Sequence, residues 1–188
     1  MASLERGAEQ RWTYPRYLAI TGEEWFDVIE GERLDTPSPG TLHQQILGTL
    51  MLGFARFVER HPRHGVLLHR PVDVVLSETD IVQPDLLYIR TERVSEIVGE
   101  FAIHGAPDLI VEIIAPYSIV RDRHQKLALY QRVGVLEYWI VDPANHAIEV
   151  LVLEEGEYQL ASFAAESGAV VSRVLEGFQV EVAEVMPR

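Results

Sequence analysis

The stretch HGAPDLIVEIIAP, residues 104–116, decides the fold because it has the pattern of a buried strand. Its residues 108–115 are almost all apolar, which is typical of a strand whose two faces are both covered. Glu112 interrupts this run, and no basic residue lies within three positions of it. Because a carboxylate loses favourable hydration when it is buried, the stretch predicts that Glu112 has a partner from elsewhere in the fold.

The segments on either side of this strand show alternating helix and strand patterns. Capping signals and apolar spacing predict the helices, while short apolar runs between turn signals predict the strands. The order helix, strand, strand, strand, helix, strand predicts a mixed central sheet flanked by helices, an α/β (α+β) fold. The expected elements are helices over 21–31, 42–61, 92–100 and 118–134, strands over 65–78, 81–90, 108–115 and 137–143, and a Pro/Gly/Ser-rich loop over 33–41.

The two ends of the chain have a different character from its centre. Residues 1–16 are expected to form an N-terminal arm, and residues 146–188 a C-terminal β extension. That extension contains a hairpin turning at Glu155-Gly156 and a terminal strand near 178–185. We find no repeat or long linker, so residues 1–188 are predicted to be a single domain. The apolar strands after residue 146 favour a symmetric contact, and we expect a homodimer.

The composition restricts location and partners. The chain has no cysteine, begins with a polar segment and has no apolar run long enough to cross a bilayer, so we expect a cytoplasmic protein without a membrane partner. Its formal net charge of −13 argues against a protein that simply coats DNA. Residues 117–134 are basic by contrast, with Asp122 opposed by three arginines and Lys126.

Strand alternation predicts where the acidic side chains lie. Glu112 shares a face of its strand with Ile110 and Ile114, and Asp85 shares a face of the preceding strand with Leu87. If the two strands pair, the carboxylates lie side by side, and at least one has a raised pKa unless a cation lies between them. A hard divalent cation with oxygen ligands suits such a pair. Asp85 alone, after a proline, could equally be a turn residue.

The helix that follows contributes a third group. Asp122, Lys126 and Tyr130 are spaced i, i+4 and i+8, so they share one helical face, and Lys126 is expected within reach of the carboxylate pair. Two simpler interpretations remain open. Lys126 could pair only with Asp122 on a solvated face, and the Tyr130 ring could belong to the core.

These residues resemble a known family of nucleases. Pro84-Asp85, followed by the strand VEI around Glu112, resembles the PD-(D/E)XK nuclease superfamily. The longer pattern GAPDLIVEIIAP…D…K…Y…GV…EYWIVDP, from Gly105 to Pro143, is similar to a restriction-endonuclease-like family common in bacteria. The segment WFDVIEGE…SP…H, from Trp25 to His43, resembles the N-terminal pattern of the same family. The resemblance implies a restriction-endonuclease-like αβββαβ core.

The resemblance also implies an activity, namely a Mg²⁺-dependent (or Mn²⁺-dependent) endonuclease that hydrolyses phosphodiester bonds of DNA rather than RNA. Asp85 and Glu112 would bind the metal together with the backbone carbonyl of Ile113. The superfamily normally has a lysine two residues after the glutamate, where this chain has Ile114. Lys126 matches the helix position from which the narrower family supplies its lysine, and it would orient the attacking water or neutralise charge on the phosphate.

Several further residues are expected to support this site. Asp27, and less strongly Glu30, matches an acidic position that completes the metal shell, while His43 and Tyr130 are expected to line the pocket. The acidic net charge and the isoleucine at position 114 favour an alternative, a catalytically weak or inactive binding or regulatory module on a nuclease fold. A basic rim for nucleic acid is expected from Arg121, Arg123 and Arg132.

Overall fold

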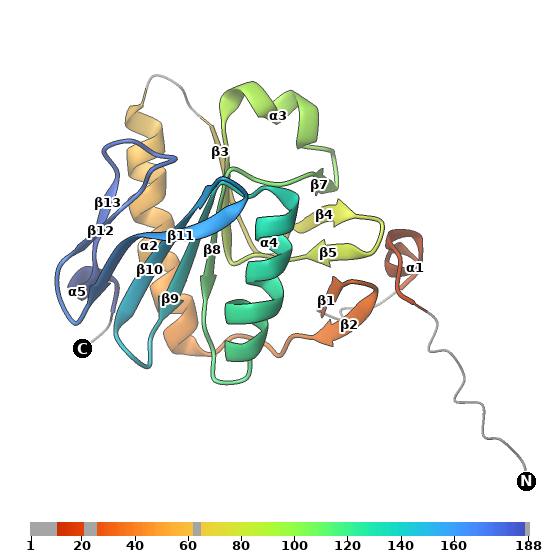
Figure 1. The fold of residues 1–188 in the computed structure, drawn as a ribbon, viewed down its shortest axis with the longest axis horizontal. Coiled ribbons are helices and arrows are strands. Elements are labelled where there is room, and N and C mark those ends of the chain that lie inside the picture. Colours follow the sequence, from red (N-terminus) through yellow and green to blue (C-terminus); the bar gives the residue numbers. More distant parts are fainter. Residues whose placement is uncertain (1–10, 21–25, 62–64, 187–188) are drawn as a thin grey trace, which may run out of the picture.

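The computed structural model describes residues 11–20, 26–61 and 65–186, and a six-stranded mixed sheet forms its centre (Figure 1). The strand at the middle of this sheet is β8 (Leu109–Ile113), which is buried along its whole length. It pairs antiparallel with β6 and parallel with β9. The strand order is β11 (Glu157–Ala165), β10 (Ala147–Glu154), β9 (Glu137–Asp142), β8, β6 (Leu86–Ile89) and β3 (Val66–His69).

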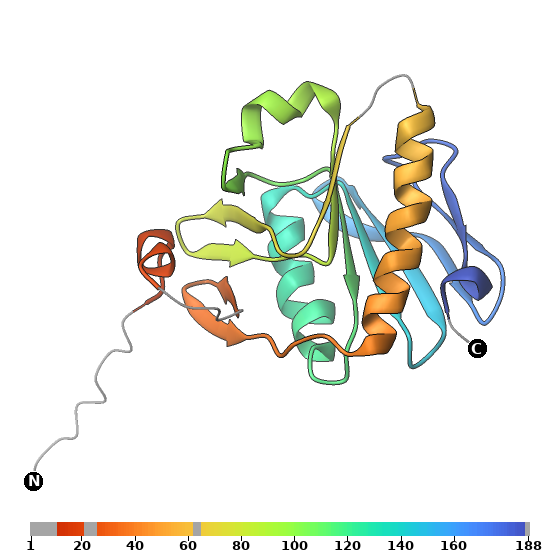
Figure 2. The ribbon, with the colours of Figure 1, turned by 180° about the vertical axis from the view of Figure 1, so that it is seen from behind.

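Helices cover both faces of this sheet. The long helix α2 (Thr41–Arg60) lies across one face, and α4 (Leu127–Val133) lies across the other, as the opposite views in Figures 1 and 2 show. Alternate residues of β8 point to opposite faces, so Val111 packs in the core beneath α2 and Ile110 packs in the core beneath α4. Glu112 follows Val111 and therefore points toward α4.

A second, five-stranded sheet lies beside the first. It joins the N-terminal hairpin to strands from the middle of the chain, and β4 pairs parallel with β7. A small cluster of Phe26, Val28 and Ile81 holds the hairpin to this sheet, and Trp12 packs against it. The strand order is β2 (Glu32–Asp35), β1 (Phe26–Ile29), β5 (Asp80–Val82), β4 (Asp73–Ser77) and β7 (Ala102–His104).

Two predicted strands are each divided between the sheets, which corrects the sequence prediction. Residues 65–78 form β3 and β4, which meet at the Arg70–Pro71 peptide bond, and residues 81–90 form β5 and β6, which meet around Pro84. Proline lacks the N–H group that a strand interior donates, so each proline ends one ladder and the chain crosses to the other sheet. The division places Asp85 at the crossing point.

The helix predicted over residues 21–31 is wrong for residues 26–31. They form β1 and a two-residue turn at Glu30-Gly31, where φ is 53° and 79°. Two positive φ values give a turn whose twist matches a hairpin, and the buried side chains of β1 favour a strand. Residues 21–25 lie outside the described residues. The predicted loop over 33–41 likewise begins with the last residues of β2.

The remaining helix predictions are confirmed, namely α2, α3 (Thr91–Ile97) and the helix that ends before Gly134. Gly134 has a φ of 86°, which glycine adopts without strain at a helix end. The hairpin at Glu155-Gly156 is confirmed by the pairing of β10 with β11. The predicted strand near 178–185 is shorter, since β13 (Gln179–Glu181) pairs with β12 (Ala169–Val171) and α5 (Val182–Val185) follows.

The N-terminal segment is only partly described. Residues 1–10 of the predicted arm lie outside the described residues. Residues after them are held in place, because the Trp12 N–H donates to the Gly31 carbonyl and the Tyr14 N–H donates to the Glu78 carbonyl. The short helix α1 (Tyr14–Leu18) follows. Within the described part of the chain, no helix is both long and apolar enough to span a membrane.

Candidate active site

Asp85 and Glu112 lie side by side on the face of the six-stranded sheet that α4 covers. Leu86 pairs with Val111, so the residue before Leu86 is next to the residue after Val111. The Ile113 N–H donates to Asp85 Oδ2 at 2.8 Å and fixes this carboxylate against β8. Asp85 is 2% exposed and Glu112 is 3% exposed. The arrangement expected from strand alternation is therefore found, and both acids are out of contact with bulk water.

Glu112 has no basic residue near it in the sequence, and Lys126 from the following helix is its partner in the fold. Its Nζ lies 2.7 Å from Glu112 Oε1, and the side chain is 1% exposed. The Tyr130 hydroxyl donates to the same Oε1 at 2.7 Å. Lys126 is therefore a buried cation that faces the sheet, which excludes a solvated pairing with Asp122 alone. Tyr130 belongs to the core and to the site at once.

Asp27 reaches the same lysine from the smaller sheet. Its Oδ2 lies 3.3 Å from Lys126 Nζ and 3.8 Å from Arg121 Nη1. Its Oδ1 accepts a hydrogen bond from the Gln83 N–H at 2.9 Å. Asp27 is on a strand rather than a helix, and it joins the cluster because β1 pairs with β5 just before the chain crosses to β6. Glu30, the weaker alternative, is instead paired with Arg132 at the surface.

Two basic side chains also lie close to Asp85. His43 Nε2 lies 3.1 Å from Asp85 Oδ2, and Arg70 Nη1 lies 3.7 Å from Asp85 Oδ1. No group among the described residues donates a hydrogen bond to Asp85 Oδ1, although this atom is buried. His43 was expected from the sequence and is placed here by the first turn of α2. Arg70 was missed, and its only signal was a basic residue at a strand end before proline.

The pKa values of these groups depend on burial and on neighbouring charge. Burial, with the charges of Asp85, Asp122 and Asp27, raises the pKa of Glu112 to about 7 even though Lys126 opposes the shift. Burial also raises the pKa of Asp122.

The pKa values of Asp85 and Lys126 shift in the direction that keeps each side chain charged. Burial alone would raise the pKa of Asp85, but the hydrogen bond and charge of His43, the Ile113 N–H and Arg70 lower it. Burial alone would lower the pKa of Lys126, but Asp27, Glu112 and Asp122 raise it. Lys126 thus keeps its proton, while Glu112 can gain or lose one near neutral pH.

The helix that carries Asp122 and Lys126 departs from α geometry where it meets the site. Residues Arg121–Lys126 form a π-helical segment, η1, which continues into α4. Such segments are rare and are frequently found at functional sites. Asp122 and Lys126 are 2% and 1% exposed, so both ends of η1 turn their side chains inward.

A divalent cation is the group that the fold family implies for this site. The described residues include no cluster of three or more His, Cys, Asp or Glu side chains placed to bind a metal. Mg²⁺ does not require one, because it is commonly bound by one or two carboxylates, waters and the phosphate of a substrate. Asp85, Glu112 and Ile113 line a narrow cavity of about 10 Å³, the size of one water molecule. Asp85 Oδ1 and Asp122 Oδ1 are buried and accept no hydrogen bond from the described residues, and such free carboxylate oxygens fit a small hard cation there.

The three arginines predicted as a basic rim are separated in the structure. Arg121 lies at the cavity, where it contacts Asp27 and Asp122 and donates to Thr36 Oγ1 at 3.0 Å. Arg123 instead pairs with Asp142 and Glu149, and Arg132 with Glu30 and Asp80. The rim beside the cavity is thus reduced to Arg121, because the other two extend from different sides of the helix toward acids of other strands.

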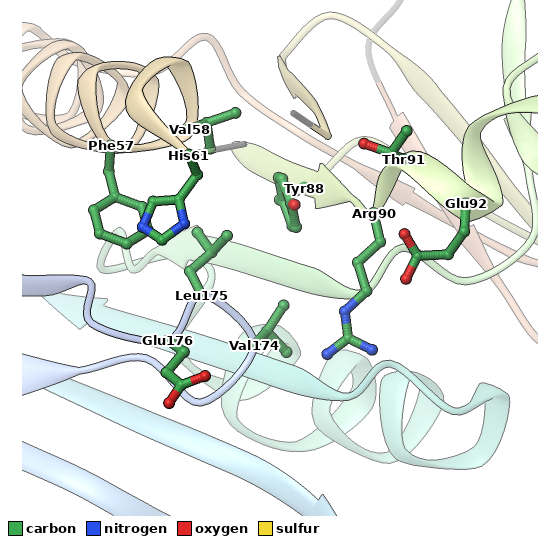
Figure 3. A pocket seen from close by; sticks show the side chains of 10 residues that line it. All are labelled: Phe57, Val58, His61, Tyr88, Arg90, Thr91, Glu92, Val174, Leu175 and Glu176. Carbon is green, nitrogen blue, oxygen red and sulfur yellow. The ribbon is translucent and has the colours of Figure 1, made fainter. Parts of the chain in front are cut away.

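A larger cavity of about 460 Å³ lies at the other end of α2, away from these acids. Figure 3 shows its side chains around a hollow between the end of α2, the end of β6 and the β12–β13 loop. It contains no pair of buried carboxylates, so its lining offers no comparable site for a cation. The lining residues are Phe57, Val58, His61, Tyr88, Arg90, Thr91, Glu92, Val174, Leu175 and Glu176.

Comparison with known proteins now identifies the family. The family model described as "Uma2: Putative restriction endonuclease" matches residues 13–183. The chain belongs to the Uma2 family. A crystal structure of a "putative nuclease belonging to DUF820" from Anabaena variabilis ATCC 29413 has a TM-score of 0.75 and 17% identity. The match covers 93% of this chain and 97% of the Anabaena chain, and it shows that the Uma2 chain has the same fold. A comparison with curated proteins found no match.

Proposed function

We propose that this Uma2-family protein is a metal-dependent endonuclease that hydrolyses phosphodiester bonds of DNA. The observation that carries the proposal is the buried contact of Lys126 with Glu112, beside Asp85, at the edge of a cavity. Buried charges that are costly to maintain and have shifted pKa values are typical of active sites. Family membership supports nuclease chemistry in general, and the metal and the DNA substrate are the specific parts of the proposal.

Each side chain of the cluster has a role in this chemistry. Mg²⁺ or Mn²⁺, when bound, would supply Lewis acidity and lower the pKa of a water molecule. Asp85 and Glu112, with the Ile113 carbonyl, would hold the cation. Lys126 stays protonated and offers positive charge to the phosphate, where negative charge increases in the transition state.

Other groups position these acids rather than contact the substrate. Tyr130 donates to Glu112 Oε1, and the His43 ring and the Ile113 N–H both contact Asp85 Oδ2, so neither carboxylate rotates freely. Asp27, with Oδ2 3.3 Å from Lys126 Nζ, is a second anionic partner of this lysine. Fixing the reacting groups in advance is a large part of what an enzyme contributes to rate.

The test is cleavage of nucleic acid by the purified full-length chain. Labelled DNA and RNA, each single-stranded and duplex, are incubated with Mg²⁺, with Mn²⁺ or with EDTA. We expect cleavage that requires the metal and disappears in Glu112→Gln, which keeps the shape of the side chain. Glu157→Gln, at the start of β11 and exposed, is the matched control and is expected to cleave normally. Absence of cleavage of every substrate with either metal would contradict the proposal.

One feature favours a second candidate, a nuclease-fold module that binds without cutting. Lys126 already contacts Glu112 at 2.7 Å and Asp27 at 3.3 Å, so the site partly neutralises its own charge. The residue two positions after Glu112 is Ile114, which cannot act as the usual lysine. Isothermal titration calorimetry decides between the two, since heat of Mg²⁺ or Mn²⁺ binding that is lost in Asp85→Asn supports the enzyme and a flat titration supports the module.

We also propose that the protein acts as a homodimer. The strand β11 forms one edge of the six-stranded sheet, and its Leu160 and Phe163 side chains are more than half exposed. An exposed edge with apolar side chains is suited to pairing with another chain. Light scattering over a range of concentrations tests this, and a monomer at every concentration would contradict it.

A further inference from the structure

A second hollow adjoins the carboxylate cavity. It has a volume of about 320 Å³, and its walls come from the loop after β2, the first turns of α2 and the crossing from β3 to β4. Thr36, Pro39 and Arg70 line both spaces. A group bound in this hollow therefore lies directly beside the carboxylates. We refer to it as the proline pocket, lined by Thr36, Pro37, Ser38, Pro39, Gln44, Leu47, His69, Arg70 and Pro71.

The proline pocket combines flat apolar walls with polar groups at its rim. Three prolines and Leu47 supply the apolar surface. The Gln44 side chain is exposed, and its amide makes no hydrogen bond with the described residues, so it is able both to donate and to accept. His69 Nδ1 lies 2.7 Å from the Arg70 carbonyl, which only accepts, so Nδ1 carries the proton and Nε2 stays available. Such walls and edges are complementary to a heteroaromatic ring.

The surrounding charge does not favour the backbone of a duplex. Binding to duplex DNA depends mainly on cationic side chains that neutralise phosphates. Each arginine of the helix after β8 is already within 4 Å of at least one carboxylate, and the whole chain carries a net charge of −13. Affinity therefore has to come from contacts other than a basic stripe. Stacking of bases on aromatic and apolar side chains is such a source, and it requires bases that are not paired.

We propose that the proline pocket binds an unpaired nucleobase next to the scissile phosphate, and that the substrate is therefore single-stranded DNA. This inference rests on the proposed function and specifies its substrate. The half-exposed Tyr117 lines the carboxylate cavity, so it offers a stacking surface for a further base of the same strand. Gln44 is placed to contact the edge of the bound base, because amide side chains form paired hydrogen bonds with adenine.

Binding of oligonucleotides to the Glu112→Gln protein tests the inference without cleavage. Fluorescence anisotropy compares a labelled 12-mer as a single strand with the same 12-mer annealed to its complement, at low and at moderate salt. We expect the single strand to bind at least tenfold more tightly, with a weak dependence on salt. In the same background, Gln44→Trp fills the pocket and is expected to raise the Kd of the single strand about tenfold, because stacking on one base contributes roughly this much.

The matched control is Gln45→Trp, which places the same bulky side chain on the neighbouring exposed residue of α2, outside the pocket. It is expected to leave the Kd unchanged. Equal or tighter binding of the duplex, an equal effect of both tryptophans, or no binding of either DNA would overturn the inference. These outcomes are separate from failure of the proposed function. If the protein cuts duplex DNA equally well with and without Gln44→Trp, the proposed function stands and base binding in the proline pocket is excluded. If the single strand binds selectively but no DNA is cut, base binding in the pocket stands and the proposed function is contradicted.

Discussion

Two fully buried glutamates on opposite faces of one sheet are stabilised in different ways. Glu112 points toward α4 and contacts Lys126 and Tyr130. Glu137, at the start of β9, is 0% exposed, and all hydrogen bonds that it accepts from the described residues come from neutral groups. These are Trp139 Nε1 at 2.6 Å, Ser172 Oγ at 2.7 Å and the backbone N–H groups of Arg173 and Val174.

We interpret the difference as that between a structural acid, Glu137, and the acid proposed to be catalytic, Glu112. Both oxygens of Glu137 are occupied by fixed donors, so this carboxylate ties the loop after β12 to the sheet. In Glu112, one oxygen takes both donors, and three other carboxylates influence its pKa. Burial alone therefore does not identify a catalytic acid. The proposed role of Glu112 rests instead on its ionisable partners, because shifted pKa values in such clusters are typical of active sites.

The largest loss of stability is expected from removing Glu137, the structural acid. Glu137→Ala leaves four donors without their acceptor, and each buried unsatisfied group costs about 1–3 kcal/mol. We expect the free energy of unfolding to fall by about 4 kcal/mol or more, measured by urea denaturation. Cleavage per folded molecule is expected to stay near the wild-type rate. A stable Glu137→Ala protein without activity would reverse the roles assigned to the two acids.

The next largest loss of stability is expected at Lys126, the cation of the candidate cluster formed with Asp27, Asp85 and Glu112. Lys126→Met keeps the length of the side chain but leaves Asp27 and Glu112 without their shared partner. Removing one member of a buried ion pair costs about 3–5 kcal/mol, reduced here because the acids can take up protons. We expect a smaller loss of stability than in Glu137→Ala, together with complete loss of cleavage. Activity retained in Lys126→Met would remove this lysine from the mechanism.

A pH dependence is expected from Glu112. Its pKa is raised from 4.5 to about 7, so between these values the folded protein holds a proton that the unfolded chain releases. The contribution of Glu112 to the free energy of unfolding therefore falls as the pH rises through this window. Urea denaturation in EDTA at pH 5, 6, 7 and 8 measures the slope, which is expected to disappear in Glu112→Gln. The same slope in both proteins would assign it to another group.

The smallest effect is expected at Tyr130. Tyr130→Phe removes the 2.7 Å hydrogen bond to Glu112 Oε1 but keeps the ring that packs edge-on against Tyr138. One such bond contributes about 1 kcal/mol, so we expect a modest loss of stability and a severalfold loss of cleavage rate. Thermal unfolding and initial rates measure the two effects. An unchanged rate would confine Tyr130 to the core.

Much of the functional cluster was predictable from the sequence because it depends on short periods. The two-residue period of a strand predicts which face of its own strand each of Asp85 and Glu112 occupies. The helical period predicts that Lys126 and Tyr130 share one face of the helix. Contacts between distant segments left no such signal. Three of the four donors to Glu137 come from the loop after β12, and the acids that pair with Arg123 and Arg132 also come from other elements. Neither the structural role of this glutamate nor the balanced charge of the helix was therefore visible.

The crossings between the sheets were only partly predictable. The sequence prediction ran each strand through its proline, Pro71 or Pro84, although proline is disfavoured inside a sheet. A proline also does not tell which sheet the chain enters next. For residues 21–31, capping-box spacing suggested a helix, although the buried residues of β1 form a hairpin strand. Tertiary pairing with β5 outweighed the local signal there.

The position of Asp27 has a consequence for the newly made protein. This residue arrives from the smaller sheet, whereas Asp85, Glu112 and Lys126 belong to the larger sheet and its helix. Contacts between segments so distant in the chain require costly loop closure before they form. A newly made polypeptide would thus lack a complete cluster until both sheets have met, and the proposed hydrolytic activity would arise only with the finished tertiary structure.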